Sequence, residues 1–154
     1  MDLLVKLYAL PALAPLEPAP ENVTIRRAFA AEKTLLARWI GQHFSDAWAS
    51  ESEAAFARLP VSCFVATAEN RLVGFACYDA TARGFFGPIG VTERERHHRV
   101  GRALLLSALH DMAGQGYGYA IIGGAGSQEF YRQHVDVMEI PGSVPGFYRG
   151  MLKE

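Results

Sequence analysis

The chain has 154 residues, of which half are hydrophobic and a fifth charged, and its formal net charge is −1. This length and composition predict one globular domain with a sizeable core, and the near-neutral charge gives no reason to expect binding to nucleic acid or to a membrane surface. Cys63 and Cys77 lie in apolar runs without metal-ligand spacing, so we expect both to be buried thiols of a cytoplasmic protein.

Residues 1–22 are expected to form an N-terminal strand and a proline-rich connector. The stretch from Leu3 to Leu10 is short and apolar and stops at a proline, which favours a strand. An apolar strand on a tether must pair either with its own sheet or with a second subunit, so a homodimer is one of two alternatives. The connector is predicted from the prolines Pro11, Pro15, Pro18 and Pro20.

Residues 23–154 are expected to form a single domain of mixed strands and helices. Ser50 and Glu53 form a capping box that should open the second helix, which Pro60 would end. Such an order of elements predicts an α+β fold, in which helices cover a mostly antiparallel sheet. The predicted strands are 23–28, 62–68, 72–79, 85–91, 119–122 and 144–152, and the predicted helices are 31–44, 50–60, 102–113 and 127–134.

The segment 85–106 combines a strand, a basic loop and an apolar helix. Free N–H groups at a helix N-terminus attract anions, and the helix dipole adds partial positive charge there. Nearby guanidinium groups can add charge-assisted hydrogen bonds. This segment is therefore predicted to bind a phosphate group, with help from Arg94, Arg96, Arg99 and Arg102.

From residue 23 onward, the order of elements and the basic loop resemble the GNAT superfamily of N-acetyltransferases. The family's acetyl-CoA loop has the pattern Arg/Gln-x-x-Gly-x-Gly/Ala, which here falls on Arg96-x-x-Arg99-x-Gly101. Arg99 stands where the family has a glycine, a residue that lets the backbone approach the phosphates. A second register, His98-x-x-Gly101-x-Ala103, restores that glycine but loses the Arg/Gln, and we prefer the first register.

The resemblance implies a sheet of six to seven strands flanked by four helices and splayed between the fourth and fifth strands, with the N-terminal strand as an addition. In this family the pantetheine arm fills the splay, and Gly87-Pro88 agrees with a strand that lacks one partner. An edge or turn proline is the alternative. The residues implied to bind acetyl-CoA are Ile89, Gly90, Val91, Arg96, His97, His98, Arg99, Val100, Gly101 and Arg102.

The family often carries a tyrosine near the cofactor sulfur, and Tyr131 matches it as the group that protonates the departing thiolate. Alternatively, Phe130 and Tyr131 are a packed aromatic pair. Two family positions differ here, because Gly124 replaces an asparagine and Val135-Asp136 replaces Gly-Phe. The side chains considered for the acceptor cleft are Trp48, Glu51, Tyr78 and Asp79, each of which has a core or surface role as its alternative.

Direct transfer of an acetyl group from acetyl-CoA to a primary amine of a small molecule or a protein is the activity that the resemblance implies. An amide near Ile89–Val91 would stabilise the oxyanion. No metal is expected, since His97 and His98 are adjacent and lack a suitably spaced carboxylate. A non-catalytic CoA-binding or dimeric interaction module on the same fold is the alternative.

Overall fold

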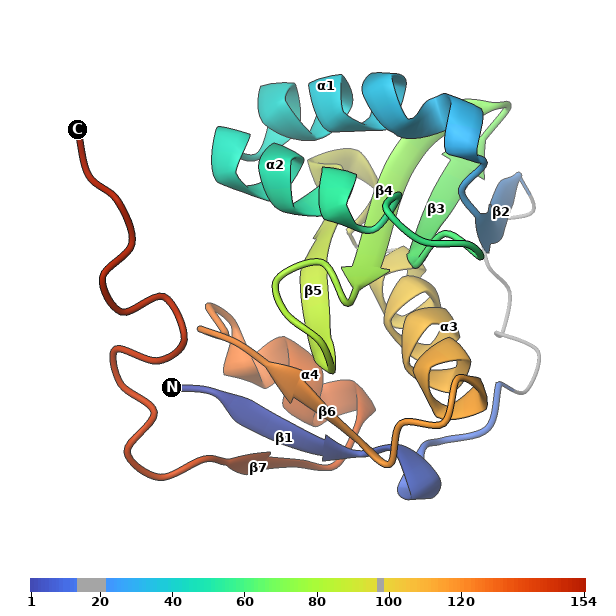
Figure 1. Ribbon diagram of the computed structural model, residues 1–154. Helices are drawn as coiled ribbons and strands as arrows, with labels where there is room; N and C mark the ends of the chain where they lie inside the picture. The colour runs from blue at the N-terminus through green and yellow to red at the C-terminus, as the bar shows by residue number, and fades with distance from the viewer. Residues whose placement is uncertain (14–21, 97–98) are drawn as a thin grey trace.

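The computed structural model describes residues 1–13, 22–96 and 99–154. In these ranges a mixed seven-stranded sheet has the order β2-β3-β4-β5-β6-β1-β7, with only β5 and β6 parallel (Figure 1). The strands are β1 (Leu3–Lys6), β2 (Val23–Arg27), β3 (Cys63–Ala68), β4 (Arg71–Tyr78), β5 (Phe85–Val91), β6 (Tyr119–Ile122) and β7 (Val137–Glu139). The α-helices are α1 (Lys33–His43), α2 (Asp46–Ala54), α3 (Val100–Gly114) and α4 (Gln128–His134), and short 3-10 helices are η1 (Leu7–Ala9), η2 (Ala30–Glu32) and η3 (Glu93–Glu95). None of the helices in the described ranges is long and apolar enough to cross a membrane.

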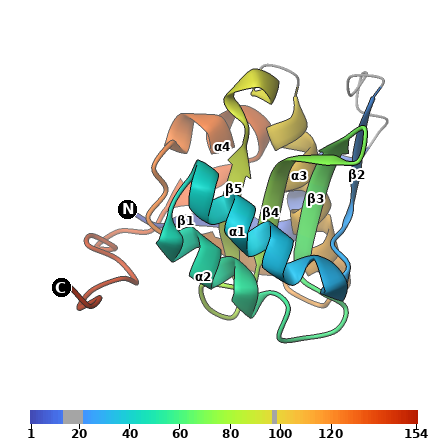
Figure 2. The same ribbon diagram turned by 90° about the horizontal axis from the view of Figure 1, so that it is seen from above.

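The helices cover both faces of the sheet (Figure 2). Successive side chains of a strand point to opposite faces, and β4 shows this alternation in its packing. Phe75 and Cys77 belong to the core under α1 and α2, whereas Ala76 and Tyr78 belong to the core that contains α3 and α4. The expected α+β architecture with helices on a mostly antiparallel sheet is confirmed, and both cysteines are buried free thiols.

The N-terminal strand pairs within its own chain. β1 lies between β6 and β7 and pairs antiparallel with both, with Leu3 opposite Ile122 and Glu139. It is shorter than expected because the chain turns into η1 after Lys6, and Leu7 is buried in the core against α3. The connector prolines beyond Pro11 lie outside the described residues.

The bounds predicted for the second helix, residues 50–60, are wrong. α2 begins at Asp46 because Ser45 is extended and its hydroxyl accepts a hydrogen bond from the Trp48 amide at 3.1 Å. Ser50 therefore lies inside the helix, which ends at Ala54, well before Pro60.

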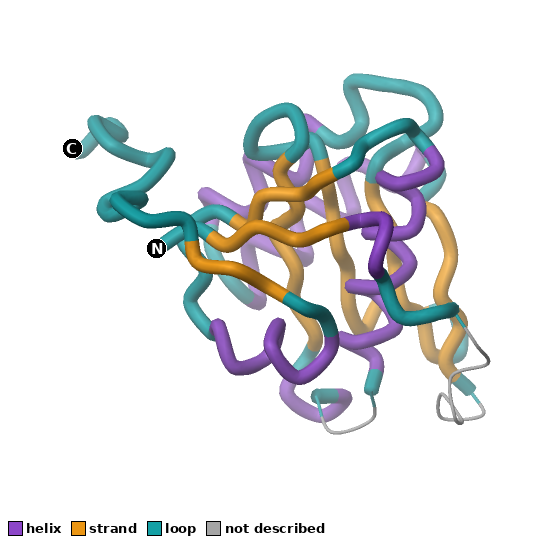
Figure 3. The backbone as a smooth tube through the Cα atoms, turned by 90° about the horizontal axis from the view of Figure 1, so that it is seen from below, coloured by secondary structure: helices purple, strands orange, loops and turns teal. Residues whose placement is uncertain are grey.

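The strand expected at 144–152 is absent from this described segment. After β7 the chain from residue 140 to 154 is irregular and is drawn as loop in Figure 3. It runs past the N-terminus toward the level of α2 (Figure 1). Gly142, Gly146 and Gly150 all have positive φ, at 75°, 82° and 78°. Such backbone turns, four residues apart, prevent an extended strand. We call residues 140–154 the C-terminal segment.

Candidate functional site

The parallel strands β5 and β6 separate soon after they meet. Their pairing joins Phe85 to Ile121 and Phe86 to Ile122, whereas β5 continues beside β4 as far as Val91. The amide of Thr92 donates to Val73 across that antiparallel pair at 2.9 Å. Because peptide groups alternate along a strand, those of Ile89 and Val91 point to the opposite, open side. The expected splay between these two strands is confirmed.

A cavity of about 930 Å³ occupies this opening, within the usual size range of small-molecule sites. Its walls come from α1, α2, β5, α4 and the turns after β6, together with the C-terminal segment. The lining residues are Phe44, Ala47, Trp48, Ser50, Glu51, Thr81, Phe86, Gly87, Pro88, Ile89, Gly90, Val91, Arg96, Gly101, Ile122, Gly123, Gly124, Ala125, Gly126, Ser127, Phe130, Tyr131, Tyr148 and Met151. The structure therefore brings together predicted site residues from three separate parts of the sequence.

Gly90 allows an aromatic cluster to approach β5 closely. A Cβ built on this residue would lie 2.5 Å from the Phe44 Cζ. The Phe44 ring in turn stacks on Trp48, with centroids 5.4 Å apart, and contacts Phe75 at 5.8 Å. This cluster forms the wall between the cavity and the core under α1 and α2.

At the end of β5 the chain carries the predicted phosphate-binding groups. Arg96 is exposed, and its Nε donates to the Val91 carbonyl at 3.2 Å. Arg99 is the N-cap of α3, but its side chain does not cap the helix. The amides of the first helical turn, from Val100 to Arg102, have no intrahelical acceptor. His97 and His98 lie outside the described residues.

Arg99 has φ 58° and ψ 14°, in the left-handed region that favours glycine. This conformation gives a physical reason why the family motif has glycine at this position. The Arg99 side chain is exposed. Arg99 therefore keeps the backbone conformation of the family's glycine, at a cost of about 1–2 kcal/mol relative to an ordinary conformation.

Tyr131 lies on α4 and lines the cavity with only 8% of its surface exposed. Burial raises the pKa of its hydroxyl to about 12, so the phenol stays protonated at neutral pH. The ring makes edge-on contacts with Phe86 and Phe130, at centroid distances of 6.3 and 5.1 Å. Tyr131 therefore packs against other aromatic rings and also lines the cavity, so the two interpretations of this residue do not exclude each other.

The opposite end of the cavity contains Trp48 and Glu51 from α2. The Tyr148 hydroxyl donates to the Glu51 carboxylate and lies 3.4 Å from Thr81 Oγ1. Burial, followed by the Glu51 hydrogen bond, raises the pKa of Tyr148 to about 12. Sequence reasoning missed Tyr148 and Met151 because it placed them in a strand, and no local pattern links them to residues about a hundred positions earlier.

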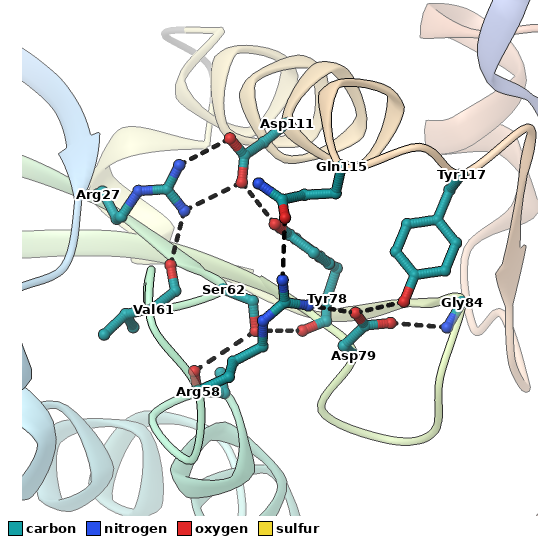
Figure 4. A network of polar contacts seen from close by, with 11 residues as sticks. Arg27, Arg58, Val61, Ser62, Tyr78, Asp79, Gly84, Asp111, Gln115 and Tyr117 are labelled. Atoms are coloured by element: carbon teal, nitrogen blue, oxygen red, sulfur yellow. Dashed lines mark hydrogen bonds and ion pairs between the residues drawn. The ribbon is translucent and has the colours of Figure 1, made fainter.

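Tyr78 and Asp79 belong to a polar network with α3 instead of the cavity wall (Figure 4). The Tyr78 hydroxyl donates to Asp111 at 2.5 Å. Asp79 accepts hydrogen bonds from Arg58 at 2.6 Å and from Tyr117 at 2.7 Å. Strand alternation turns Tyr78 toward α3, and Asp79 has positive φ at the end of β4. Neither residue lines the cavity, so the expectation that Tyr78 and Asp79 belong to the acceptor cleft is corrected.

Comparison with known proteins gives one family. The model of the acetyltransferase (GNAT) family matches residues 28–135. None of the curated proteins compared with the chain matches it.

Several solved structures have a similar fold. A GCN5-related glucosamine N-acetyltransferase region of a fungal multi-domain β-N-acetylglucosaminidase has a TM-score of 0.70 at 13% identity, over 89% of this chain and 19% of that one. A GCN5-related N-acetyltransferase from Kribbella flavida has a TM-score of 0.62 at 23% identity, over 89% and 52%. A GNAT family acetyltransferase from Brucella melitensis, in complex with acetyl-CoA, has a TM-score of 0.55 at 14% identity, over 77% and 96%. The chain thus spans about half or less of the first two.

Proposed function

The chain belongs to the GNAT family of acetyltransferases, and we propose that it transfers the acetyl group of acetyl-CoA directly to a primary amine. The observation that carries this proposal is the cavity at the splay, where the open edge of β5, Arg96 and Tyr131 meet. Acetyl-CoA is the donor, in agreement with the family and with the acetyl-CoA complex of the Brucella melitensis protein. It supplies an acetyl group activated as a thioester.

The residues at the end of β5 fit the diphosphate of the donor. The first-turn amides of α3, Val100 to Arg102, offer N–H donors at the positive end of the helix dipole. Arg96 adds a guanidinium beside them, and the exposed Arg99 adds a second positive charge. The peptide groups of Ile89 and Val91 can hydrogen-bond the pantetheine arm as a neighbouring strand would.

The proposed transfer forms a C–N bond and breaks the C–S bond. One proton leaves the ammonium group to solvent before attack, and a second passes from nitrogen to solvent as the new bond forms; Tyr131 regains from solvent the proton that it gives to sulfur. The amide of Ile89 or Val91 donates to the carbonyl oxygen as negative charge develops on it. Tyr131 provides the proton that the departing sulfur needs, because its raised pKa keeps it protonated.

Calorimetric titration with CoA, together with release of CoA thiol from acetyl-CoA in the presence of amines, tests the proposal. We expect binding, and release that depends on the amine. No heat at millimolar protein would refute the whole assignment. Binding without amine-dependent release would instead support a non-catalytic CoA-binding module, the alternative favoured by Arg99 and by Gly124 at the family's asparagine position. Homodimerisation and a cytoplasmic location stay predictions.

A further inference from the structure

The cavity has opposite charges at its two ends. Among the lining residues only Arg96 and Glu51 carry a formal charge. Arg96 follows the end of β5, whereas Glu51 is connected through Tyr148 to Thr81, which precedes the start of β5. The two charged groups therefore lie toward opposite ends of this strand. A donor bound with its diphosphate at Arg96 leaves the Glu51 end for the acceptor.

The surroundings of Glu51 are mainly apolar and aromatic. Trp48 precedes it by one turn of α2, and Phe44 stacks on that indole. Tyr148 and Met151 of the C-terminal segment line the same cavity. A carboxylate beside aromatic faces attracts a cation by charge and by cation–π interaction. Since no Lys or Arg lines this end among the described residues, a carboxylate or phosphate on the acceptor would have no cationic side chain beside it.

Building on the proposed function, we propose that Glu51 and Tyr148 form the subsite for the ammonium group of a small primary amine with an apolar or aromatic body. Glu51 accepts hydrogen bonds from the ammonium group, and Tyr148 orients that carboxylate through its hydroxyl. Trp48, Phe44 and Met151 contact the apolar body. The C-terminal segment covers this end, and the cavity of about 930 Å³ also has to hold the pantetheine arm, so a small molecule fits better than the lysine of a folded protein.

The first test uses phenethylamine, glycine, glucosamine and a lysine-containing peptide as acceptors with the full chain. Release of CoA thiol should show kcat/KM for phenethylamine about tenfold or more above the other three, because each of these lacks the apolar body or has additional polar groups. A peptide, glycine or glucosamine that matches or exceeds phenethylamine would overturn the substrate class. Titration with CoA in parallel separates this failure from a failure of the proposed function.

The second test changes the subsite itself. Glu51→Gln keeps the shape but removes the charge, and should lower kcat/KM for phenethylamine about ten- to a hundredfold. Tyr148→Phe keeps the aromatic wall and should cause a smaller loss, mainly in KM. Glu53→Gln on the exposed side of the same helix is the matched control and should change neither value. CoA affinity should stay constant throughout, and an unchanged kcat/KM in Glu51→Gln would overturn the proposal.

A binding measurement gives an answer that depends on neither turnover nor variants. Tryptophan fluorescence of the CoA-loaded wild-type protein should respond to phenethylamine, because Trp48 lines the cavity. It should respond at least about tenfold more weakly to 2-phenylethanol, which has the same body without the ammonium group. Equal responses would overturn the ammonium subsite even if acetyl transfer occurs. Selective amine binding without transfer would support the subsite and contradict the proposed function.

Discussion

Replacing Gly90 with alanine tests how closely the aromatic cluster packs on β5. The new Cβ would lie 2.5, 2.8 and 2.9 Å from three carbons of the Phe44 ring, whereas ordinary contacts begin at 3.4 Å. The ring would have to retreat by roughly 1 Å. Trp39, Trp48 and Phe75 all lie within 5.8 Å of it, centroid to centroid, so a retreat of the ring would disturb its packing against these three side chains.

The cost follows from this crowding. Inserting a methyl group into a packed core costs about 1–3 kcal/mol, which for a chain of this size lowers the melting temperature by about 3–9 °C. Differential scanning calorimetry measures the shift. Gly114→Ala is the control, because a Cβ at that helical position meets nothing within 4 Å, and it should raise stability by up to about 1 kcal/mol.

A double variant decides whether Phe44 is the cause. In Gly90→Ala/Phe44→Leu the smaller side chain leaves room for the methyl group, so the combined loss should be less than the sum of the single losses by about 0.5 kcal/mol or more. Additive losses would mean that the two residues do not touch. A melting temperature of Gly90→Ala within about 1 °C of the wild type would refute the close approach of Phe44 to β5.

Three further predictions concern the phosphate end, the thiol end and the polar network. Arg99→Gly should be more stable than Arg99→Ala by about 1 kcal/mol, because only glycine is unstrained at this positive φ, and it should bind CoA more tightly. Tyr131→Phe should lower turnover about a hundredfold while CoA affinity changes little. Asp111→Asn should cost about 2 kcal/mol, since it removes the negative charge that pairs with Arg27 and one of the two oxygens that accept from Arg27 and Tyr78. Burial alone would raise the pKa of Asp111, but the hydrogen bonds from Arg27 and Tyr78 outweigh burial and lower the pKa. The extra stability of the wild type over Asp111→Asn should therefore be present above pH 3.8, the ordinary pKa of this side chain, and should shrink as the pH falls below it.

Each of these has a result that contradicts it. Equal stability and CoA affinity of the two Arg99 variants, measured by thermal melts and calorimetry, would mean that Arg99 is not left-handed. Unchanged turnover in Tyr131→Phe would leave this residue a purely packing role. Urea titrations of Asp111→Asn at pH 3 and pH 7 that differ from the wild type by the same free energy would show that Asp111 is not ionised preferentially in the folded protein.

Local patterns predicted the centre of the fold well. The bounds of β5, Phe85–Val91, match the expected strand because Gly84 and Thr92 flank a run without polar or charged side chains. The hairpin of β3 and β4 was predictable from its polar turn, where Glu69 and Asn70 take positive φ. The motif also identified Arg99 as a residue at a glycine position, although its left-handed backbone was not predicted.

Long-range contacts explain the rest. Ser45 and Ser50 both precede runs that can form a helix, and sequence alone does not show which hydroxyl meets an amide. The hydrophobic residues between Val144 and Leu152 suggested a strand, but the glycines between them turn the chain. Contact of Tyr148 with Glu51 joins residues 97 positions apart, and no local pattern carries such information.

The position of β1 constrains how the molecule assembles. β1 precedes the other strands of the sheet in the chain but pairs with residues 119–122 and 137–139, so it is synthesised well before its partners. β2 to β5 can associate meanwhile, because each pairs with the next strand along the chain, whereas the pairing of β1 requires closure of a loop of more than a hundred residues. Until Val137 and its neighbours have been synthesised, Leu3 and Val5 therefore remain apolar side chains without a completed sheet, and the acceptor end of the cavity, which includes residues of the C-terminal segment, forms after β2 to β5.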